Sequence, residues 1–583
     1  VQDLGLVGLA DGIPKQFTGL LRIGWSGIGL TGISQPNYRE VGYRTHTEEV
    51  QEHFSWFRGR HNLKFGFNLL RSEYDDYGAD SSLFGNLSFG SKFTGHPYAD
   101  FLLGLPTRAT RSFPPIRVDR NRWSFDFYAL DDFKLSPKLT LNVGLRYELH
   151  FGWRENGDRM SMFDIDSGSI VVPDGALAKV SPIFPQGYVN IAEASSLGLP
   201  SRKLVRGDYN NIAPRIGLAY RPWGINTVFR AGVGVFYDVV PFVYALGFGG
   251  MPYILQEPSY TNPVSNPQVI LPRVFPTTST GGPETVDLPW AQNPDLRTPY
   301  TFQYNFTIER QQWDTGFRLS YIGTAGRKAP WVYNYNSPVP DARPYIEKPR
   351  PYPSYPDIYY VTNGAGHQYN GLTAEVKRQM VKGLYLQGSW TWARDIHDMD
   401  YNWDFDMWVY TSENPFDRRR EVAPARDIPT HRFNVNYIYQ LPFGRGRPFL
   451  SSINRWADLA VGGWELSGIY TAQTGEFLTP FWTGPDPVGI YYTEGDPAEI
   501  SIRPDILRNP NLPTSQRTID RWFDPEAFAP PPAGRFGTSA KGTILGPGVN
   551  LWAMGIHKDF LLYSDRVRLW WELVTRNTFT HPN

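Results

Sequence analysis

The sequence predicts an all-β protein, a large antiparallel transmembrane β-barrel, from three observations. Polar and apolar residues alternate along many long segments, and tight turns alternate with long connections. Aromatic residues make up 15% of the 583 residues, including 19 Trp and 34 Tyr. In an outer-membrane barrel the strands alternate in the same way, aromatic residues lie at both membrane interfaces, and the turns are short on one side and long on the other.

Composition excludes several other classes of protein. The 57 basic and 57 acidic residues balance to a net charge of zero, so there is no electrostatic signature of nucleic-acid binding. The absence of cysteine excludes disulfides, thiolate catalysis and Cys-ligated metal clusters. No segment approaches the roughly 20 apolar residues of a membrane-spanning helix, and the first residues lack the features of a signal peptide. A mean hydropathy of −0.39 does not argue against a barrel, because alternating strands never form a continuous apolar run.

The clearest predicted strand covers residues 139–151, where the odd positions are apolar and the even positions are polar. The same alternation recurs over residues 63–69, 122–129, 302–309, 384–392, 433–441 and 567–573. Many of these runs reach the roughly 9–11 residues of a transmembrane strand, whereas strands of globular proteins average about 5–6. Polar side chains such as Arg146 and Glu148 would be costly inside a sandwich core. We therefore expect the polar faces to line a lumen and the apolar faces to contact lipid.

Connection lengths favour the barrel over a soluble β-sandwich or propeller. Tight turns are predicted at residues 59–62, 135–138, 223–226, 313–316, 381–383 and 563–565. Long loops are predicted over residues 152–212, 240–298, 328–367, 394–429 and 476–550. Loops beyond about 12–15 residues are uncommon in compact domains, and no repeat of the roughly 40–45 residues of a propeller blade is present. The abundance of proline and aromatic residues predicts that the loops pack on one another as an ordered outer surface.

By pattern, about 16 strands are counted, the first of them within residues 17–30, and residues 1–583 are interpreted as a single barrel domain. Several segments resemble the Oar-like TonB-dependent receptors of acidobacteria and myxobacteria. They are FSWFRGRHNLKFG (54–66), DFLLGLP (100–106), LTLNVGLRYE (139–148), SWTWAR (389–394), LPFGRG (441–446), GGWELSG (462–468), RWFDP (521–525) and NTFTHPN (577–583). They follow one another in order along nearly the whole chain, which makes the resemblance specific.

The resemblance implies an N-terminal carboxypeptidase-regulatory-like domain, a plug and a barrel of about 22 strands. Neither the first domain nor the plug is expected within these residues, and the last strands are also expected to be missing, so we expect a fragment. The implied function is uptake or export of a large substrate, such as a glycan, a peptide or protein, or a metal chelate, through a plug-gated barrel. The implied location is the outer membrane of a Gram-negative bacterium. The implied partners are membrane lipid, lipopolysaccharide and the TonB–ExbB–ExbD complex, which would act through the plug.

The most distinctive loop carries five aspartates with interleaved aromatic residues. Carboxylate oxygens are the donors that Ca²⁺ prefers, and the candidate calcium ligands are Asp395, Asp398, Asp400, Asp404 and Asp406. The spacing is not that of an EF-hand. Aromatic side chains of the same loop are candidate ligand contacts: Tyr401, Trp403, Trp408 and Tyr410. The alternative is a packed loop whose acidic side chains cap turns or pair with arginines.

A run of three arginines, Arg418, Arg419 and Arg420, is the second candidate for ligand binding. It is suited to an anionic substrate or a lipopolysaccharide phosphate, and the alternative is an ion-pair network at the rim.

The ten histidines show no ligand spacing such as H-E-x-x-H, and neither a nucleophile elbow nor a Walker loop occurs. We therefore predict no catalytic residues, no enzymatic activity and, apart from the candidate calcium ion, no cofactor. Two further hypotheses stay open. One is a barrel-anchored surface protein, either an adhesin or a cell-surface scaffold, and the other is a soluble carbohydrate-binding or hydrolytic β-protein.

Overall fold

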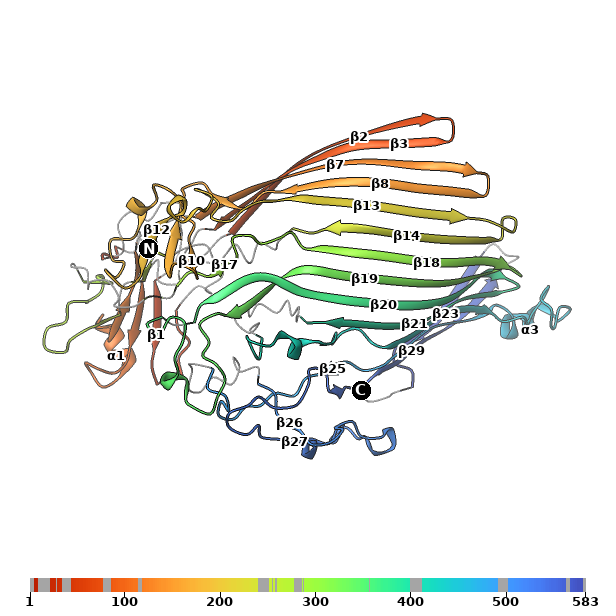
Figure 1. Cartoon of the computed structure of the whole chain (residues 1–583). Coiled ribbons are helices and arrows are strands. Elements are labelled where there is room, and N and C mark those ends of the chain that lie inside the picture. Colours follow the sequence, from red (N-terminus) through yellow and green to blue (C-terminus); the bar gives the residue numbers. More distant parts are fainter. Residues whose placement is uncertain are drawn as a thin grey trace.

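A computed structural model describes most of the chain: residues 5–8, 21–27, 29–33, 43–76, 85–113, 118–239, 251–253, 255–256, 259–276, 286, 288–355, 357–398, 412–490, 502–562 and 567–579. Its main feature is a 20-stranded sheet. Fourteen long strands form what we call the wall, and six short strands come from the connections (Figure 1).

The wall strands are β2 (Tyr43–Arg58), β3 (His61–Asp76), β7 (Val118–Ser136), β8 (Leu139–His150), β13 (Asp208–Tyr220), β14 (Thr227–Tyr237), β18 (Tyr300–Gln312), β19 (Thr315–Asn334), β20 (Tyr359–Val381), β21 (Leu384–His397), β23 (His431–Gln440), β24 (Trp464–Gln473), β29 (Val549–Leu562) and β30 (Val567–Thr575). The short strands are β9 (Arg154–Glu155), β10 (Met162–Asp164), β11 (Ser169–Val172), β12 (Asn190–Glu193), β17 (Ala291–Gln292) and β22 (Ala423–Pro424).

Each wall strand pairs antiparallel with the next wall strand along the chain. The predicted all-β, antiparallel fold is therefore confirmed. Within the described ranges, β2 and β30 each have a single neighbour and are the two edges of the wall. The predicted first strand within residues 17–30 is wrong as a wall strand. The part of it that is described, β1 (Arg22–Trp25), belongs to a separate four-stranded sheet, and the wall begins at Tyr43.

The short connections lie at one end of the wall strands and the long connections lie at the other end, as Figure 1 shows. The turns predicted between residues 59 and 383 join successive wall strands, and Gly59 makes the first of them with a φ of +62°. The turn at 563–565 lies outside the described residues. One connection on the short side, between β23 and β24, is longer than predicted and contains the helix α3 (Arg455–Val461). On the other side, strands β19 and β20 extend into the predicted loop 328–367, and β21 continues to His397.

The outward face of the wall carries an apolar belt with charged residues at both ends. On β3 the belt runs from Leu63 to Leu69, and the next outward residue, Arg71, pairs with Glu48 at 3.2 Å. At the other end Leu63 lies opposite Asp131, whose carboxylate is 2.7 Å from His61. The eight residue steps from Leu63 to Arg71 span roughly 26 Å along the strand at 3.3 Å per residue. With the tilt of roughly 35–45° that barrel strands have, this is a height of roughly 20 Å, close to the apolar band, about 25 Å tall, of an outer-membrane barrel.

Among the helices in the described ranges, none has the length and hydrophobicity of a membrane-spanning helix.

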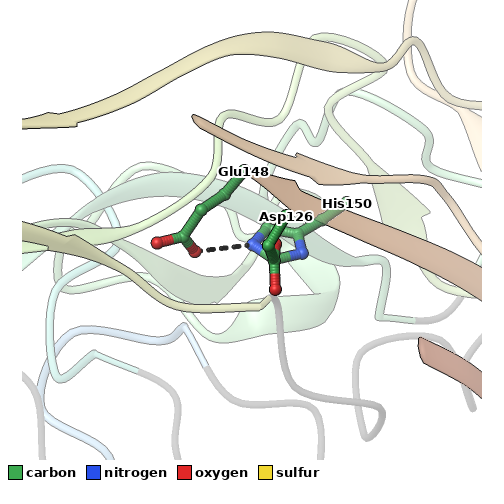
Figure 2. A group of neighbouring side chains, drawn as sticks. All are labelled: Asp126, Glu148 and His150. Atoms are coloured by element: carbon green, nitrogen blue, oxygen red, sulfur yellow. Dashed lines mark hydrogen bonds and ion pairs between the residues drawn. The ribbon is translucent and has the colours of Figure 1, made fainter. Parts of the chain in front are cut away.

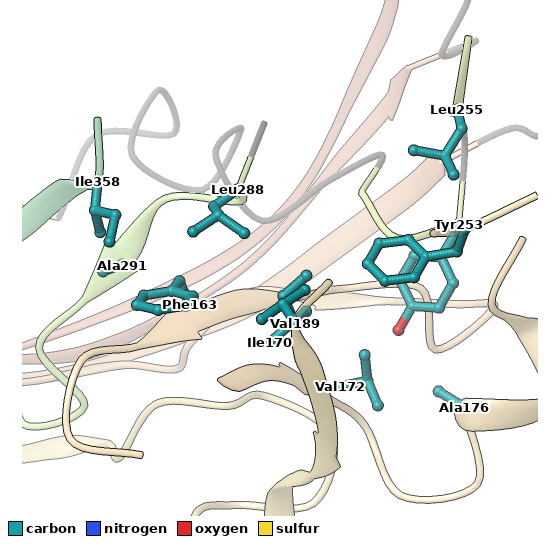
Figure 3. Close-up of a cluster of buried hydrophobic side chains, with 11 residues drawn as sticks. Phe163, Ile170, Val172, Ala176, Val189, Tyr253, Leu255, Leu288, Ala291 and Ile358 are labelled. Carbon is teal, nitrogen blue, oxygen red and sulfur yellow. The ribbon is translucent and has the colours of Figure 1, made fainter. Parts of the chain in front are cut away.

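The long connections pack into what we call the cap, at one end of the wall. Its largest apolar core joins three connections that are distant in sequence, with Phe163, Ile170, Tyr253, Ala291 and Ile358 all buried (Figure 3). The Tyr253 hydroxyl donates to the Met160 carbonyl at 2.9 Å. The prediction that the loops form an ordered, packed layer is confirmed for these residues.

A second part of the cap is a small sheet in the order β1–β4–β5–β16, with β1 parallel to β4. The other strands of this sheet are β4 (Asn86–Phe89), β5 (Arg108–Thr110) and β16 (Tyr260–Thr261). Helix α1 (Pro97–Leu102) packs on it through Phe101, whose ring lies 5.3 Å from that of Phe89. The remaining small elements are β6 (Ser112–Phe113), β15 (Leu255–Gln256), β25 (Phe477–Leu478), β26 (Asp505–Ile506), β27 (Phe528–Ala529), β28 (Ile544–Leu545) and the 3₁₀ turns η2 (Leu177–Lys179), η3 (Ala194–Leu197), η4 (Tyr345–Glu347), η5 (Arg418–Glu421), η7 (Thr514–Gln516) and η8 (Pro525–Ala527).

Asp100 explains why the DFLLG segment folds as it does. Its buried carboxylate accepts hydrogen bonds from the Phe93 N–H at 3.1 Å, the Thr94 N–H at 2.7 Å and the Thr94 hydroxyl at 2.6 Å. Burial alone would raise the pKa of Asp100, but these hydrogen bonds outweigh it and lower the pKa. The carboxylate therefore fixes the turn before α1.

Replacing Asp100 with alanine should destabilise the small sheet by about 1–3 kcal/mol, because buried donors lose their acceptor. Hydrogen exchange of the amides of β4 and β5 measures this effect. Leu102→Ala, at a side chain that is 68% exposed on the same helix, is the control and should leave the exchange unchanged. Equal protection in both variants would contradict the role given to Asp100.

Candidate functional site

The predicted ligand residues that are described fall at the outer end of β21 and in the connection that follows it. Asp398, Arg418 and Arg419 line a pocket of about 450 Å³ together with Phe416, Asp417 and Val422. The pocket forms because η5 brings the arginines back beside the end of β21. The Asp417 side chain accepts a hydrogen bond from the Arg419 N–H at 3.3 Å and so caps this turn.

Arg418 is held at one side of the pocket by two contacts. Its guanidinium lies 3.2 Å from the Asp398 carboxylate and 5.5 Å from the centre of the Trp331 ring. Asp398 in turn accepts the Gly366 N–H at 2.7 Å. Gly364 has a φ of +152°, which favours glycine, and a Cβ there would displace the Arg418 guanidinium. The side chain is therefore placed before any ligand arrives.

Arg419 extends into solvent, with its side chain 89% exposed. Its guanidinium makes a forked contact to Asp417, at 2.7 and 3.1 Å, and this hydrogen bonding lowers the pKa of the Asp417 carboxyl. An exposed guanidinium beside an aromatic and an aliphatic side chain suits a ligand that has both anionic and apolar parts.

Arg420 points away from the pocket into an ion-pair network within the protein. It contacts the fully buried carboxylate of Glu413 at 2.7 Å. Arg503, from a distant connection, also binds Glu413 and lies 3.7 Å from Glu421. Lys541 completes the network, 2.6 Å from Glu421. Of the two interpretations of the arginine run, the ion-pair network describes Arg420, whereas Arg418 and Arg419 line the pocket.

Burial raises the pKa of Glu413, although Arg503 and Arg420 oppose this shift. The network joins the connection after β21 to the connection after β24. It therefore holds these two connections together beside the pocket.

Only two of the five candidate calcium ligands lie within the described residues. Asp398 is bound to Arg418, and Asp395 faces the His367 imidazole at 3.5 Å. Neither arrangement brings the two carboxylates to one ion. Asp400, Asp404 and Asp406 lie outside the described residues, as do the aromatic candidates Tyr401, Trp403, Trp408 and Tyr410, so the calcium site stays a prediction.

A second polar cluster, which the sequence analysis did not single out, lies on the inner face of the wall. Asp126 on β7 is directly opposite Glu148 on β8, and His150 is the last residue of β8 (Figure 2). One donor atom from each of the three lies within 4.8 Å of the others. Arg146 contacts Asp126 at 2.7 Å and Glu148 at 3.1 Å. In the described part of the chain, no other group of three such side chains is close enough to share a metal ion.

The stability of the connection after β24 should depend on pH through Asp505. Arg535 makes two hydrogen bonds to its carboxylate, at 2.7 and 2.6 Å, and this contact lowers the pKa of Asp505. A carboxyl with a lowered folded pKa stabilises the fold above the unfolded pKa, which is about 3.9, and this stability is lost as the pH falls towards the folded value. Hydrogen exchange of β26 and β27, compared with Asp505→Asn at each pH, should show a protective difference at pH 6 that declines below about pH 4. A difference independent of pH would contradict this assignment.

Comparison with known proteins gives one match along the whole chain. The family model described as "Outer membrane beta barrel domain" matches residues 1–583. No match was found among curated proteins.

Solved structures to which the chain is similar include the outer membrane transporter YddB from Escherichia coli, at 8% identity and a TM-score of 0.46, covering 96% of this chain and 54% of that chain. The copper transporter OprC has 9% identity and a TM-score of 0.41, covering 92% and 52%. The ferric enterobactin receptor PfeA from Pseudomonas aeruginosa has 12% identity and a TM-score of 0.40, covering 92% and 48%. The chain thus spans about half the length of these structures, and similarity at this level carries no information on what it binds.

Proposed function

Because the chain belongs to the outer membrane beta-barrel domain family, and so lies in the outer membrane of a Gram-negative bacterium, we propose that it forms the wall and cap of an Oar-like TonB-dependent receptor. The receptor moves a large substrate, such as a glycan, a peptide or protein, or a metal chelate, across that membrane. The wall encloses the path, the cap captures the substrate, and a plug outside these residues gates the lumen. The energy comes from the TonB–ExbB–ExbD complex through the plug. The proposal includes no enzymatic step.

One observation carries the proposal: a packed cap stands on a wall that is apolar outside and polar inside. A protein that served only as an anchor would need the apolar belt but would gain nothing from buried ionic groups along the inner face, which are costly unless they are paired. Here Asp126, Arg146 and Glu148 lie on that face as a paired group. The resemblance of eight segments to Oar-like receptors supports the TonB-dependent mechanism.

The pocket supplies the place where we propose that the substrate first binds. Arg418 is fixed by Asp398 and Trp331, and Arg419 extends into solvent beside it. The pair would bind an anionic group of the substrate, and Phe416 would contact its apolar part.

The mass of the native polypeptide tests the proposal most directly. The protein is extracted from an outer-membrane fraction, its intact mass is measured, and its retention by an immobilised periplasmic domain of TonB is assayed. A polypeptide well above 66.4 kDa that TonB retains is the expected result. A polypeptide of 66.4 kDa that TonB does not retain would overturn the transporter proposal. A passive pore, an adhesin or a surface scaffold would then be the remaining functions.

A further inference from the structure

The cluster of Asp126, Glu148 and His150 on the inner face has the composition and spacing of a metal site. We infer that these three side chains bind a divalent transition-metal ion. One donor atom of each lies within 4.8 Å of the other two. Donors around a tetrahedral Zn²⁺ ion, at about 2.0–2.2 Å from it, lie roughly 3.3–3.6 Å apart. A small rotation of the side chains is therefore enough to bring all three onto one ion.

The backbone holds the three side chains rigidly. Asp126 and Glu148 are direct partners in the β7–β8 ladder, and Ser124 is the partner of His150. The His150 Nδ1 atom lies 3.3 Å from the Ser124 hydroxyl, and Nε2 faces Glu148 at 3.3 Å. Histidine ligands of metals commonly have their second ring nitrogen bonded to a polar group, which orients the imidazole. Ser124 supplies this contact.

An unsatisfied oxygen gives independent evidence for a ligand. Asp126 is only 5% exposed, and its Oδ1 atom is buried with no hydrogen-bond partner among the described residues. A buried acceptor without a partner is costly. A bound cation would satisfy this oxygen.

Arg146 accounts for the other oxygens of the cluster. Its guanidinium contacts Asp126 through Oδ2 and Glu148 through Oε1. The atoms that it does not contact, Asp126 Oδ1, Glu148 Oε2 and His150 Nε2, are the three metal donors. The alternative is a cluster in which Arg146 is the complete counterion and no metal binds.

The donor types select the class of ion. An imidazole nitrogen suits Zn²⁺ and its neighbours in the first transition row, whereas Ca²⁺ and Mg²⁺ prefer sites made of oxygen alone. The His150 side chain is 13% exposed, so the site is reached from the inner side of the wall.

Titration of the full-length protein, purified from the outer membrane in detergent and treated with a chelator, tests the inference. Zn²⁺ is the probe, and Co²⁺ serves as a spectroscopic substitute. The wild type should bind about one equivalent, and His150→Gln and Asp126→Asn should each weaken binding about tenfold or more. His367→Gln is the matched control, because its imidazole faces the single carboxylate of Asp395, and it should change nothing. Far-UV circular dichroism establishes that each variant is folded.

A fourth variant separates the metal site from a simple ion-pair cluster. Arg146→Gln removes the competing guanidinium and should tighten Zn²⁺ binding several-fold if the two carboxylates are metal ligands. The inference is overturned if the wild type binds no stoichiometric Zn²⁺, or if binding is unchanged in His150→Gln and Asp126→Asn. Neither result depends on transport, so the proposed function stands or falls separately.

Discussion

Phe306→Arg is expected to destabilise the membrane-inserted wall by about 2–4 kcal/mol, the penalty for an arginine in the middle of the lipid-facing band of a barrel. Phe306 lies on β18 in the apolar belt, is 45% exposed on the outward face, and has Ala231 and Tyr321 as its ladder partners. Neither ladder partner offers the arginine an acidic side chain. Urea unfolding of the protein in phospholipid vesicles measures the change in the free energy of unfolding.

Asn305→Arg is the control for this substitution. The two residues are adjacent on one strand and point to opposite faces, so the same arginine side chain is placed in two different environments. The inner-face arginine should change the free energy of unfolding by less than about 1 kcal/mol, because it stays in contact with water. Equal destabilisation by both variants would mean that the faces of β18 are assigned wrongly.

The second large effect is expected in the cap, where Arg503→Ala should destabilise the two joined connections by about 3–5 kcal/mol. The Arg503 side chain is 2% exposed and binds Glu413, whose side chain is fully buried. Removing Arg503 leaves the buried Glu413 carboxylate with less positive charge to balance it. An unbalanced buried charge destabilises the fold strongly. Hydrogen exchange of residues 412–426 and 502–540 measures the opening of this region.

Arg419→Ala is the matched control, because Arg419 is an exposed arginine of the same connection and should give no measurable change. A second variant keeps the interpretation specific. Adding Glu413→Gln to Arg503→Ala removes the uncompensated charge and should recover part of the lost protection, as coupled sites do. Simple additivity of the two effects would show that the residues do not act as a pair.

The wall could be predicted because the alternation and the turn residues that define its strands lie in consecutive positions of the sequence. The alternation over residues 139–151 defines β8 and both of its faces, and turn residues such as Gly59 define where hairpins reverse. The cap could be predicted only as a packed layer. Strand β1 pairs in parallel with β4, more than sixty residues later in the chain. Strands of four residues are too short to show a clear alternation of polar and apolar residues. This is why the segment 17–30 was assigned to the wall.

The contacts within the candidate sites could not be predicted from the local sequence. Asp126 and Glu148 face each other in the β7–β8 hairpin, but the register shifts between Lys134 and Ser136, so the turn at 135–138 alone does not predict this pair. Nothing local indicates that Arg418 meets Asp398 and Trp331 while Arg420 turns to Glu413. These choices depend on how distant connections pack, and neighbouring residues of one type take different roles as a result.

The length of the wall strands has a consequence for how substitutions act. Strand β20 has 23 residues and spans roughly 75 Å, far more than the apolar belt needs. The cap therefore stands beyond the apolar belt, and the residues that line the pocket and the residues that face lipid occupy different heights on the same strands. A substitution in one layer leaves the packing of the other unchanged.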